Sequence, residues 1–130
     1  GDGQIVARVA SIQNTNGWAK AGVMIRNDLT ASAMHAALVV TPGNGVAFET
    51  RTPAGQITTY TASTGAAPMW LKLVLSGSTI TASTSADGVS WTAVGTQSLS
   101  LAGSSVYVGL AVTSHADGTL CTATIDNVSR

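Results

Sequence analysis

The sequence predicts an all-β protein, an antiparallel two-sheet β-sandwich of the jelly-roll type. Ser and Thr together account for 32 of the 130 residues, whereas Lys occurs only twice. β-Branched residues favour strands, and so few charges leave little of the Glu–Lys pairing that supports surface helices. Apolar and polar residues also alternate with a period of two, and Gly, Asn, Asp and Pro interrupt that alternation at short intervals.

In the first half of the chain the alternation predicts strands at residues 4–12, 19–27, 33–41, 46–52 and 56–61. Three breaks separate them. Residues 14–17 contain Asn and Gly, and residues 42–45 and 53–55 contain Pro and Gly. These residue types supply the backbone conformations of turns. Residues 28–33 are the helix candidate, about one turn long.

In the second half the same pattern predicts strands at residues 70–76, 79–85, 92–98, 106–114 and 120–128. Ser76-Gly77, Asp87-Gly88 and Asp117-Gly118 separate several of them, and Asp-Gly tolerates the positive φ of tight hairpins. Parallel strands would need helical crossovers, for which the chain has no room, so we expect antiparallel sheets.

Strand parity predicts which side chains face the core. Leu71, Leu73 and Leu75 alternate with Lys72, so the leucines should point inward and Trp70 outward. The same reasoning assigns the following residues to the core: Ala21, Val23, Ile25, Phe48, Val106, Val108, Leu110 and Val112. It assigns these residues to the outer faces: Lys20, Met24, Arg26, Glu49, Arg51, Lys72 and Tyr107.

Composition limits the class of protein. The length suits one domain spanning residues 1–130, which we expect to be a monomer when isolated. The formal net charge is zero, which argues against nucleic acid and anionic membrane as partners. No apolar run approaches a membrane span, and no signal peptide is visible at Gly1, so we interpret the chain as a mature or excised segment. The lone Cys121 is interpreted as a small buried hydrophobe.

Four segments carry a family resemblance: residues 18–26 (WAKAGVMIR), 70–73 (WLKL), 85–91 (SADGVSW) and 108–115 (VGLAVTSH). With them the chain resembles the concanavalin A-like (laminin G-like) sandwich modules that are appended to secreted bacterial polysaccharide-degrading enzymes. It is also similar to the domain of unknown function called regulation of enolase, which shares the AGxMxR-type strand and the SxDGxxW hairpin. The resemblance implies two stacked sheets, an extracellular location and usually a non-catalytic role.

The carboxylates favour a protein that is not an enzyme. The catalytic branch of the resembled superfamily carries paired carboxylates on one strand, whereas Glu49 is the only glutamate here and has no Asp within three residues. Glycoside hydrolysis needs two placed carboxylates. Asp87, Asp117 and Asp126 could approach Glu49 in space, but each has a local explanation at a turn or strand end. The motif Ser85-x-Asp87-Gly88-x-x-Trp91 is interpreted as an Asp-box turn.

Eight residues are candidates for carbohydrate binding: the aromatic Trp18, Tyr60 and Trp70 for stacking on sugar rings, and Arg26, His35, Glu49, Arg51 and Lys72 for polar contacts. Arginines near a tryptophan would suit an acidic polysaccharide. Alternatives remain open, because Trp18 could close the end of the sandwich, Trp70 could pack under a loop, and the Arg–Glu–Arg set could form surface ion pairs of little energetic weight.

The resemblance also implies a structural calcium ion, and no other cofactor is expected. Such sites draw on an early loop and a carboxylate of the last strand, so Asp126 is the candidate ligand, with Asp2 or the carbonyls of residues 43–45. The alternative is Asp126 as a turn acceptor before Asn127. His35 and His115 lie 80 positions apart and lack further ligands at suitable spacing for a transition metal.

The first functional hypothesis is a secreted, non-catalytic carbohydrate-binding module that targets a covalently attached catalytic domain to a polysaccharide. The second is a structural or adhesive spacer of a large cell-surface protein. A third, minor hypothesis is a glycan-active hydrolase, which the lone glutamate disfavours.

Overall fold

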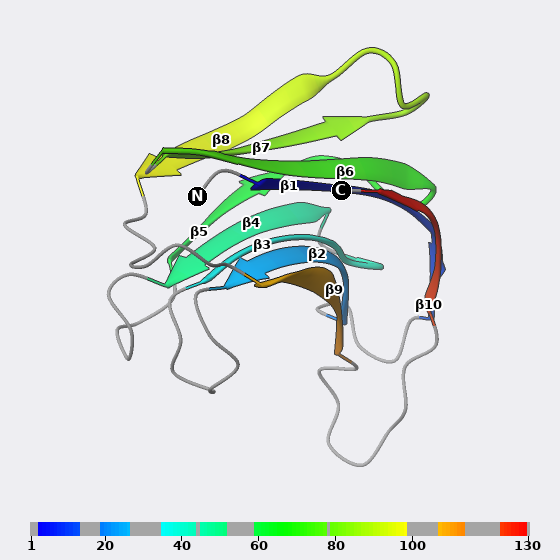
Figure 1. Ribbon diagram of the computed structural model, residues 1–130. Coiled ribbons are helices and arrows are strands. Elements are labelled where there is room, and N and C mark those ends of the chain that lie inside the picture. Colours follow the sequence, from blue (N-terminus) through cyan, green and yellow to red (C-terminus); the bar gives the residue numbers. More distant parts are fainter. Residues whose placement is uncertain are drawn as a thin grey trace.

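The protein is an all-β sandwich of two antiparallel five-stranded sheets, as the sequence predicts (Figure 1). The computed structural model describes residues 3–13, 19–26, 35–43, 45–51, 59–77, 79–98, 107–113 and 123–129. Within these ranges every regular element is a strand, and no helix is long and apolar enough to cross a membrane.

Sheet A has the order β10-β1-β6-β7-β8 and sheet B has the order β5-β4-β3-β2-β9. The strands of sheet A are β1 (Gly3–Ile12), β6 (Met69–Ser76), β7 (Thr79–Ser85), β8 (Thr92–Ser98) and β10 (Ala123–Ser129). The strands of sheet B are β2 (Lys20–Arg26), β3 (His35–Val40), β4 (Val46–Arg51), β5 (Thr59–Ser63) and β9 (Tyr107–Thr113).

All ten predicted strands are present, and two of them, β7 and β8, have the predicted bounds. Most of the others begin or end within a few residues of the expected position, which is the usual uncertainty at strand ends. The helix candidate at 28–33, together with Trp18, His115 and Cys121, lies outside the described residues.

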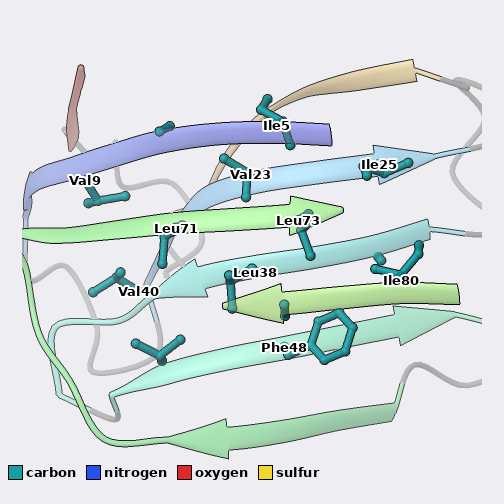
Figure 2. Close-up of a cluster of buried hydrophobic side chains, with 14 of the residues drawn as sticks. Ile5, Val9, Val23, Ile25, Leu38, Val40, Phe48, Leu71, Leu73 and Ile80 are labelled. Carbon is teal, nitrogen blue, oxygen red and sulfur yellow. The ribbon is translucent and has the colours of Figure 1, made fainter. Parts of the chain in front are cut away.

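The core lies between the two sheets and is built from the side chains that parity predicts. Leu71, Leu73 and Leu75 of β6 are buried, and Val23 and Ile25 of β2 meet them from the other sheet. Figure 2 shows Leu71, Leu73, Val23 and Ile25 in one cluster with labelled residues of β1, β3, β4 and β7. Burying each large aliphatic side chain stabilises the fold by about 1.5–3 kcal/mol. The cluster therefore determines which face of each strand points into the core and which face points to solvent.

The edge strand β9 departs from the expected burial. Leu110 pairs with Val23 and Val112 pairs with Ala21, so both have the predicted inward parity. Nevertheless their exposed fractions are 48% and 49%, whereas the sequence predicts core positions. The reason is that β9 ends its sheet, and the opposite sheet covers an edge strand less completely than a central one. Val106, predicted in the same row, lies outside the described residues.

Candidate functional site

The predicted carbohydrate-binding residues are divided between the two outer faces of the sandwich. Arg26, His35 and Glu49 lie on strands of sheet B, whereas Trp70 and Lys72 lie on β6 of sheet A. Arg51 and Tyr60 occupy backbone positions in β4 and β5 of sheet B. The two groups are therefore separated by the core and cannot contact one sugar unit together.

On sheet B the strand register places four residue positions in a single cross-strand row. Arg51 pairs with His35, and His35 pairs with Arg26. Arg26 in turn pairs with Tyr107 of β9. The row of paired positions crosses four strands and spans about 14 Å at the usual strand spacing.

Beside this row the outer face of sheet B is hollowed into an open pocket of about 420 Å³, which we call the groove. Its lining residues are Lys20, Met24, Arg26, His35, Ala37, Val39, Glu49, Leu110, Ala111 and Val112. A smaller hollow of about 200 Å³ adjoins it, with Met24, Arg26 and Leu110 in common. The smaller hollow is also lined by Tyr107 and Gly109, so the depression extends to the β9 edge.

Small residues create the groove. Next to the cross-strand row, the outer face of three neighbouring strands carries mostly small residues. They are Gly22 on β2, Ala37 and Val39 on β3, and Gly109 and Ala111 on β9. Gly109 pairs with Met24, and a Cβ built on Gly109 would meet no atom within 4 Å. The longer side chains of Lys20, Arg26 and Glu49 therefore bound a space that the sheet itself does not fill.

The floor of the groove is apolar. Ala37, Val39 and Ala47 form a second buried cluster, with exposed fractions of 4%, 2% and 2%, and Met24 packs against it. The Nη1 group of Arg26 donates a hydrogen bond to the sulfur of Met24 at 3.7 Å. This contact holds the guanidinium beside the apolar floor, where a ligand could meet polar and apolar groups at once.

An ion pair crosses the groove above β3. The Nζ atom of Lys20 lies 3.9 Å from Oε2 of Glu49, and both side chains are more than three-quarters buried. Because Ala21 pairs with Val40 and Ala37 pairs with Glu49, the pair joins β2 to β4 over the intervening strand. Lys20 was not among the residues predicted for the site, although its outward parity with Met24 and Arg26 was the available signal.

On sheet A the two predicted residues have partners within the protein. A Cβ built on Gly88 of the β7–β8 turn would lie 2.9 Å from the Trp70 ring, so this turn rests on the indole. Nζ of Lys72 lies 4.3 Å from the centroid of the Trp91 ring, a cation–π contact. The sequence leaves two roles open for Trp70, and the contact with Gly88 corresponds to one of them, packing under a neighbouring loop. A contact between Trp70 and a ligand stays a prediction.

The β7–β8 turn is the Asp-box turn that the sequence predicts. Oδ1 of Asp87 accepts hydrogen bonds from the N–H groups of Val89 at 2.8 Å and Ser90 at 2.9 Å. The Ser85 hydroxyl donates to the same oxygen and accepts from the N–H of Gly88, each at 2.9 Å. The Ser90 and Val89 amides are the main reason that the pKa of Asp87 lies below its ordinary value.

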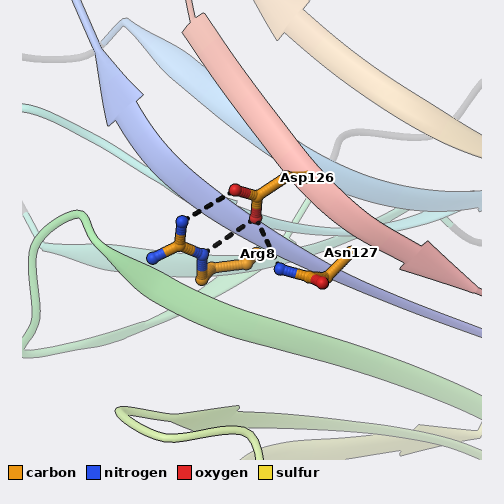
Figure 3. Close-up of polar contacts among 3 residues, drawn as sticks. All are labelled: Arg8, Asp126 and Asn127. Carbon is orange, nitrogen blue, oxygen red and sulfur yellow. Dashed lines mark hydrogen bonds and ion pairs between the residues drawn. The ribbon is translucent and has the colours of Figure 1, made fainter.

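Asp126, the predicted calcium ligand, binds an arginine (Figure 3). Its Oδ1 and Oδ2 accept hydrogen bonds from Nε and Nη2 of Arg8 at 2.8 and 2.7 Å, and Asn127 Nδ2 donates to Oδ1 at 3.0 Å. The Arg8 hydrogen bond is the largest cause of the lowered pKa of Asp126. A guanidinium across both oxygens does not fit a calcium ion at the same carboxylate. Among the described residues no cluster of three or more His, Cys, Asp or Glu could hold a metal, and Asp2 lies outside them.

No protein-family model and no curated protein matches the sequence. Among solved structures the fold is similar to the crystal structure of a protein of unknown function from Saccharomyces cerevisiae. The TM-score is 0.74 at 18% sequence identity, and the match covers 98% of this chain and 68% of the yeast chain. At this identity the likeness establishes the sandwich fold alone.

Proposed function

We propose that the protein is a non-catalytic carbohydrate-binding module that holds a polysaccharide in the groove of sheet B. In this proposal it belongs to a secreted bacterial enzyme of the kind that carries concanavalin A-like modules, and it keeps the attached catalytic domain close to its substrate. The observation that carries the proposal is the groove itself, where an apolar floor of small residues lies between long polar side chains on adjacent strands.

This combination of groups suits sugars. A pyranose presents hydroxyls at its rim and C–H groups on its faces, so it needs donors, acceptors and apolar contact together. Arg26 supplies donors, Glu49 supplies acceptor oxygens, and Met24 with Val39 supplies apolar surface. The groove is open along the sheet, which accommodates a chain rather than an enclosed small molecule.

The arrangement of carboxylates supports a binding role. Glu49 is the only acidic residue in the strands of sheet B, and it pairs with Lys20. The other described carboxylates, Asp87 and Asp126, lie on sheet A and serve the Asp-box turn and the Arg8 pair. Hydrolysis by two facing carboxylates would need a second carboxylate beside Glu49, and the described residues supply none. Weak binding at one groove still raises the effective substrate concentration for a tethered enzyme.

Affinity electrophoresis and calorimetry against a panel of soluble polysaccharides test the proposal. Gly109→Phe places a ring over the smaller hollow that adjoins the groove, at a position where a Cβ would meet no atom within 4 Å, so we expect it to obstruct the ligand and abolish binding. Thr96→Phe is the matched control, because Thr96 is an exposed position on sheet A. Binding that survives Gly109→Phe, or that Thr96→Phe removes, would place the ligand elsewhere. No binding to any glycan would refute the proposal.

A spacer of a large surface protein is the second candidate. The observation favouring it is that Trp70 and Lys72, two of the predicted contacts, are engaged by the protein's own β7–β8 hairpin and Trp91. The sequence of the parent gene distinguishes the two candidates. A neighbouring hydrolase or lyase domain would favour the binding module, whereas tandem β-domains would favour the spacer.

A further inference from the structure

We propose that Lys20 and Glu49 bind one sugar hydroxyl between them, which makes the groove selective for uncharged polysaccharides. This inference rests on the proposed function and names the ligand class of the same site. It arises from the geometry of the ion pair that the two residues form inside the groove.

The two side chains reach across the apolar floor from different levels of the sheet. Glu49 lies level with Met24, since both pair with Ala37 from opposite sides. Lys20 precedes Met24 by four residues on β2, which is about 13 Å along the strand. The charged ends of Lys20 and Glu49 therefore meet diagonally over the floor, where a sugar chain lying in the groove would contact them.

The ion pair leaves both charged groups short of hydrogen bonds. The distance of 3.9 Å between Nζ and Oε2 is longer than the roughly 3.2 Å at which N–H···O hydrogen bonds end. The exposed fractions of the two side chains are only 23% and 21%. Within the described part of the chain, no side-chain hydrogen bond to either charged group accompanies the pair. Largely buried charges need such bonds in addition to their mutual attraction, so a ligand that supplies them would be held here.

A sugar hydroxyl offers both of the missing bonds. Its oxygen accepts a hydrogen bond from the ammonium group of Lys20, and its proton is donated to the carboxylate of Glu49. An oxygen placed about 2.8 Å from both Nζ and Oε2 would see them at an angle of about 90°, and a small widening of the pair brings this angle toward the tetrahedral value. One hydroxyl therefore fits between the two groups.

The same pair disfavours charged substituents. A sulfate or carboxylate near Lys20 would also approach Glu49, whose like charge cancels much of the attraction, and it has no proton to donate to that carboxylate. Arg26 and His35 also line the groove, but both are engaged by interactions within the protein. Lys20 and Glu49 therefore set the charge preference of the groove, and we expect an uncharged chain rich in hydroxyls.

Three pairs of polymers with a common backbone test this selectivity by calorimetry in about 0.15 M salt. The uncharged members are dextran, hydroxyethyl cellulose and methyl-esterified polygalacturonate. Their anionic counterparts are dextran sulfate, carboxymethyl cellulose and polygalacturonate. In each pair that binds, we expect the uncharged member to bind more tightly by about fivefold or more. Equal or tighter binding of the anionic members would overturn the inference.

Two substitutions test the ion pair itself. Lys20→Met keeps the length of the side chain and removes the donor, so the binding of uncharged polymers should weaken about tenfold. Glu49→Gln leaves Lys20 without its countercharge, so the preference should shift toward the anionic members, which a merely structural ion pair would not produce. Lys72→Met removes the same charge from sheet A and should bind like the wild type.

A double variant keeps the test valid if a single substitution destabilises the fold. Lys20→Met combined with Glu49→Gln leaves no unpaired charge in the groove, and replacing both partners of an ion pair is often neutral for stability. Thermal unfolding verifies that each variant is folded. We expect the double variant to bind uncharged polymers as weakly as Lys20→Met does, because the same hydroxyl has lost its donor in both.

The outcomes separate the two proposals. Binding of uncharged polymers that Gly109→Phe removes, but that Lys20→Met and Glu49→Gln leave unchanged, would overturn the role of the ion pair while the binding function stands. Equal weakening by Lys20→Met and Lys72→Met would show a non-specific effect of charge and would also overturn it. Absence of binding to all of these polymers and to the wider panel would refute the proposed function itself.

Discussion

Replacing Gly22 by Ala should destabilise the protein strongly, although the change adds one methyl group. Gly22 lies in the central part of sheet B, where it pairs with Val39 on one side and Ala111 on the other. A Cβ at this position would overlap the carbonyl oxygen of Leu38 and would lie 2.7 Å from the Cα of Val39. Both contacts are with backbone, so no side-chain rotation relieves them, and β2 and β3 must separate.

The magnitude follows from two opposing effects. Overpacking in a well-packed region costs typically 1–3 kcal/mol, and a clash with fixed backbone belongs at the upper end, about 3 kcal/mol. The lower entropy of the unfolded chain with Ala offsets about 0.5–1 kcal/mol. The net loss is about 2–2.5 kcal/mol, which corresponds to a Tm decrease of about 10 °C for a chain of this length.

Gly109→Ala is the matched control for this prediction. It lies on the adjacent strand and the same face, but its Cβ would meet nothing within 4 Å. We expect no loss of stability from this variant and a gain of up to about 1 kcal/mol. Urea unfolding followed by circular dichroism measures both. A Gly22→Ala protein as stable as the wild type, or equal losses in the two variants, would refute the argument from close strand approach.

Three further predictions concern the core, the acid dependence and the calcium expectation. Leu73→Ala removes a side chain with 0% exposure and should cost about 2–5 kcal/mol in urea unfolding, and a loss below about 1 kcal/mol would contradict the observed core. Because the pKa of Asp87 is lowered in the folded protein, its contribution to stability is full above the ordinary carboxylate pKa of about 4 and is lost as the pH falls through the lowered value. Asp87→Asn should therefore flatten the acid limb of the stability–pH curve, and an unchanged limb would show that the turn does not favour the ionised form. Millimolar calcium should leave Tm unchanged because Arg8 occupies both oxygens of Asp126, whereas a rise that Asp126→Asn abolishes would establish a calcium site there.

Sequence periodicity predicted the strands well because it is a local signal. All ten strands occur, and the alternation of Leu71, Leu73 and Leu75 with Lys72 correctly identified the buried face of β6. The Asp-box turn was equally predictable, since Ser85, Asp87 and Gly88 bond to one another within four residues.

The assembly of the site was not predictable, because it depends on pairings between distant strands. β1 pairs with both β10 and β6, and β9 joins β2, so the sheet to which each strand belongs follows from contacts that no local pattern encodes. Parity placed Trp70 and Arg26 outward, but it could not show that they face opposite sides of the molecule. It also gave no signal that β9 ends its sheet and leaves Leu110 half-exposed.

Amide NMR spectra of the isotopically labelled protein, titrated with oligosaccharides of a polysaccharide that binds, test the central claim most directly. We predict that shifts concentrate on Lys20, Arg26, His35 and Gly109, all on the groove side of sheet B. Shifts confined to Trp70, Lys72 and their neighbours on sheet A would contradict the account, because the ligand would then be held on the face that the Asp-box hairpin covers.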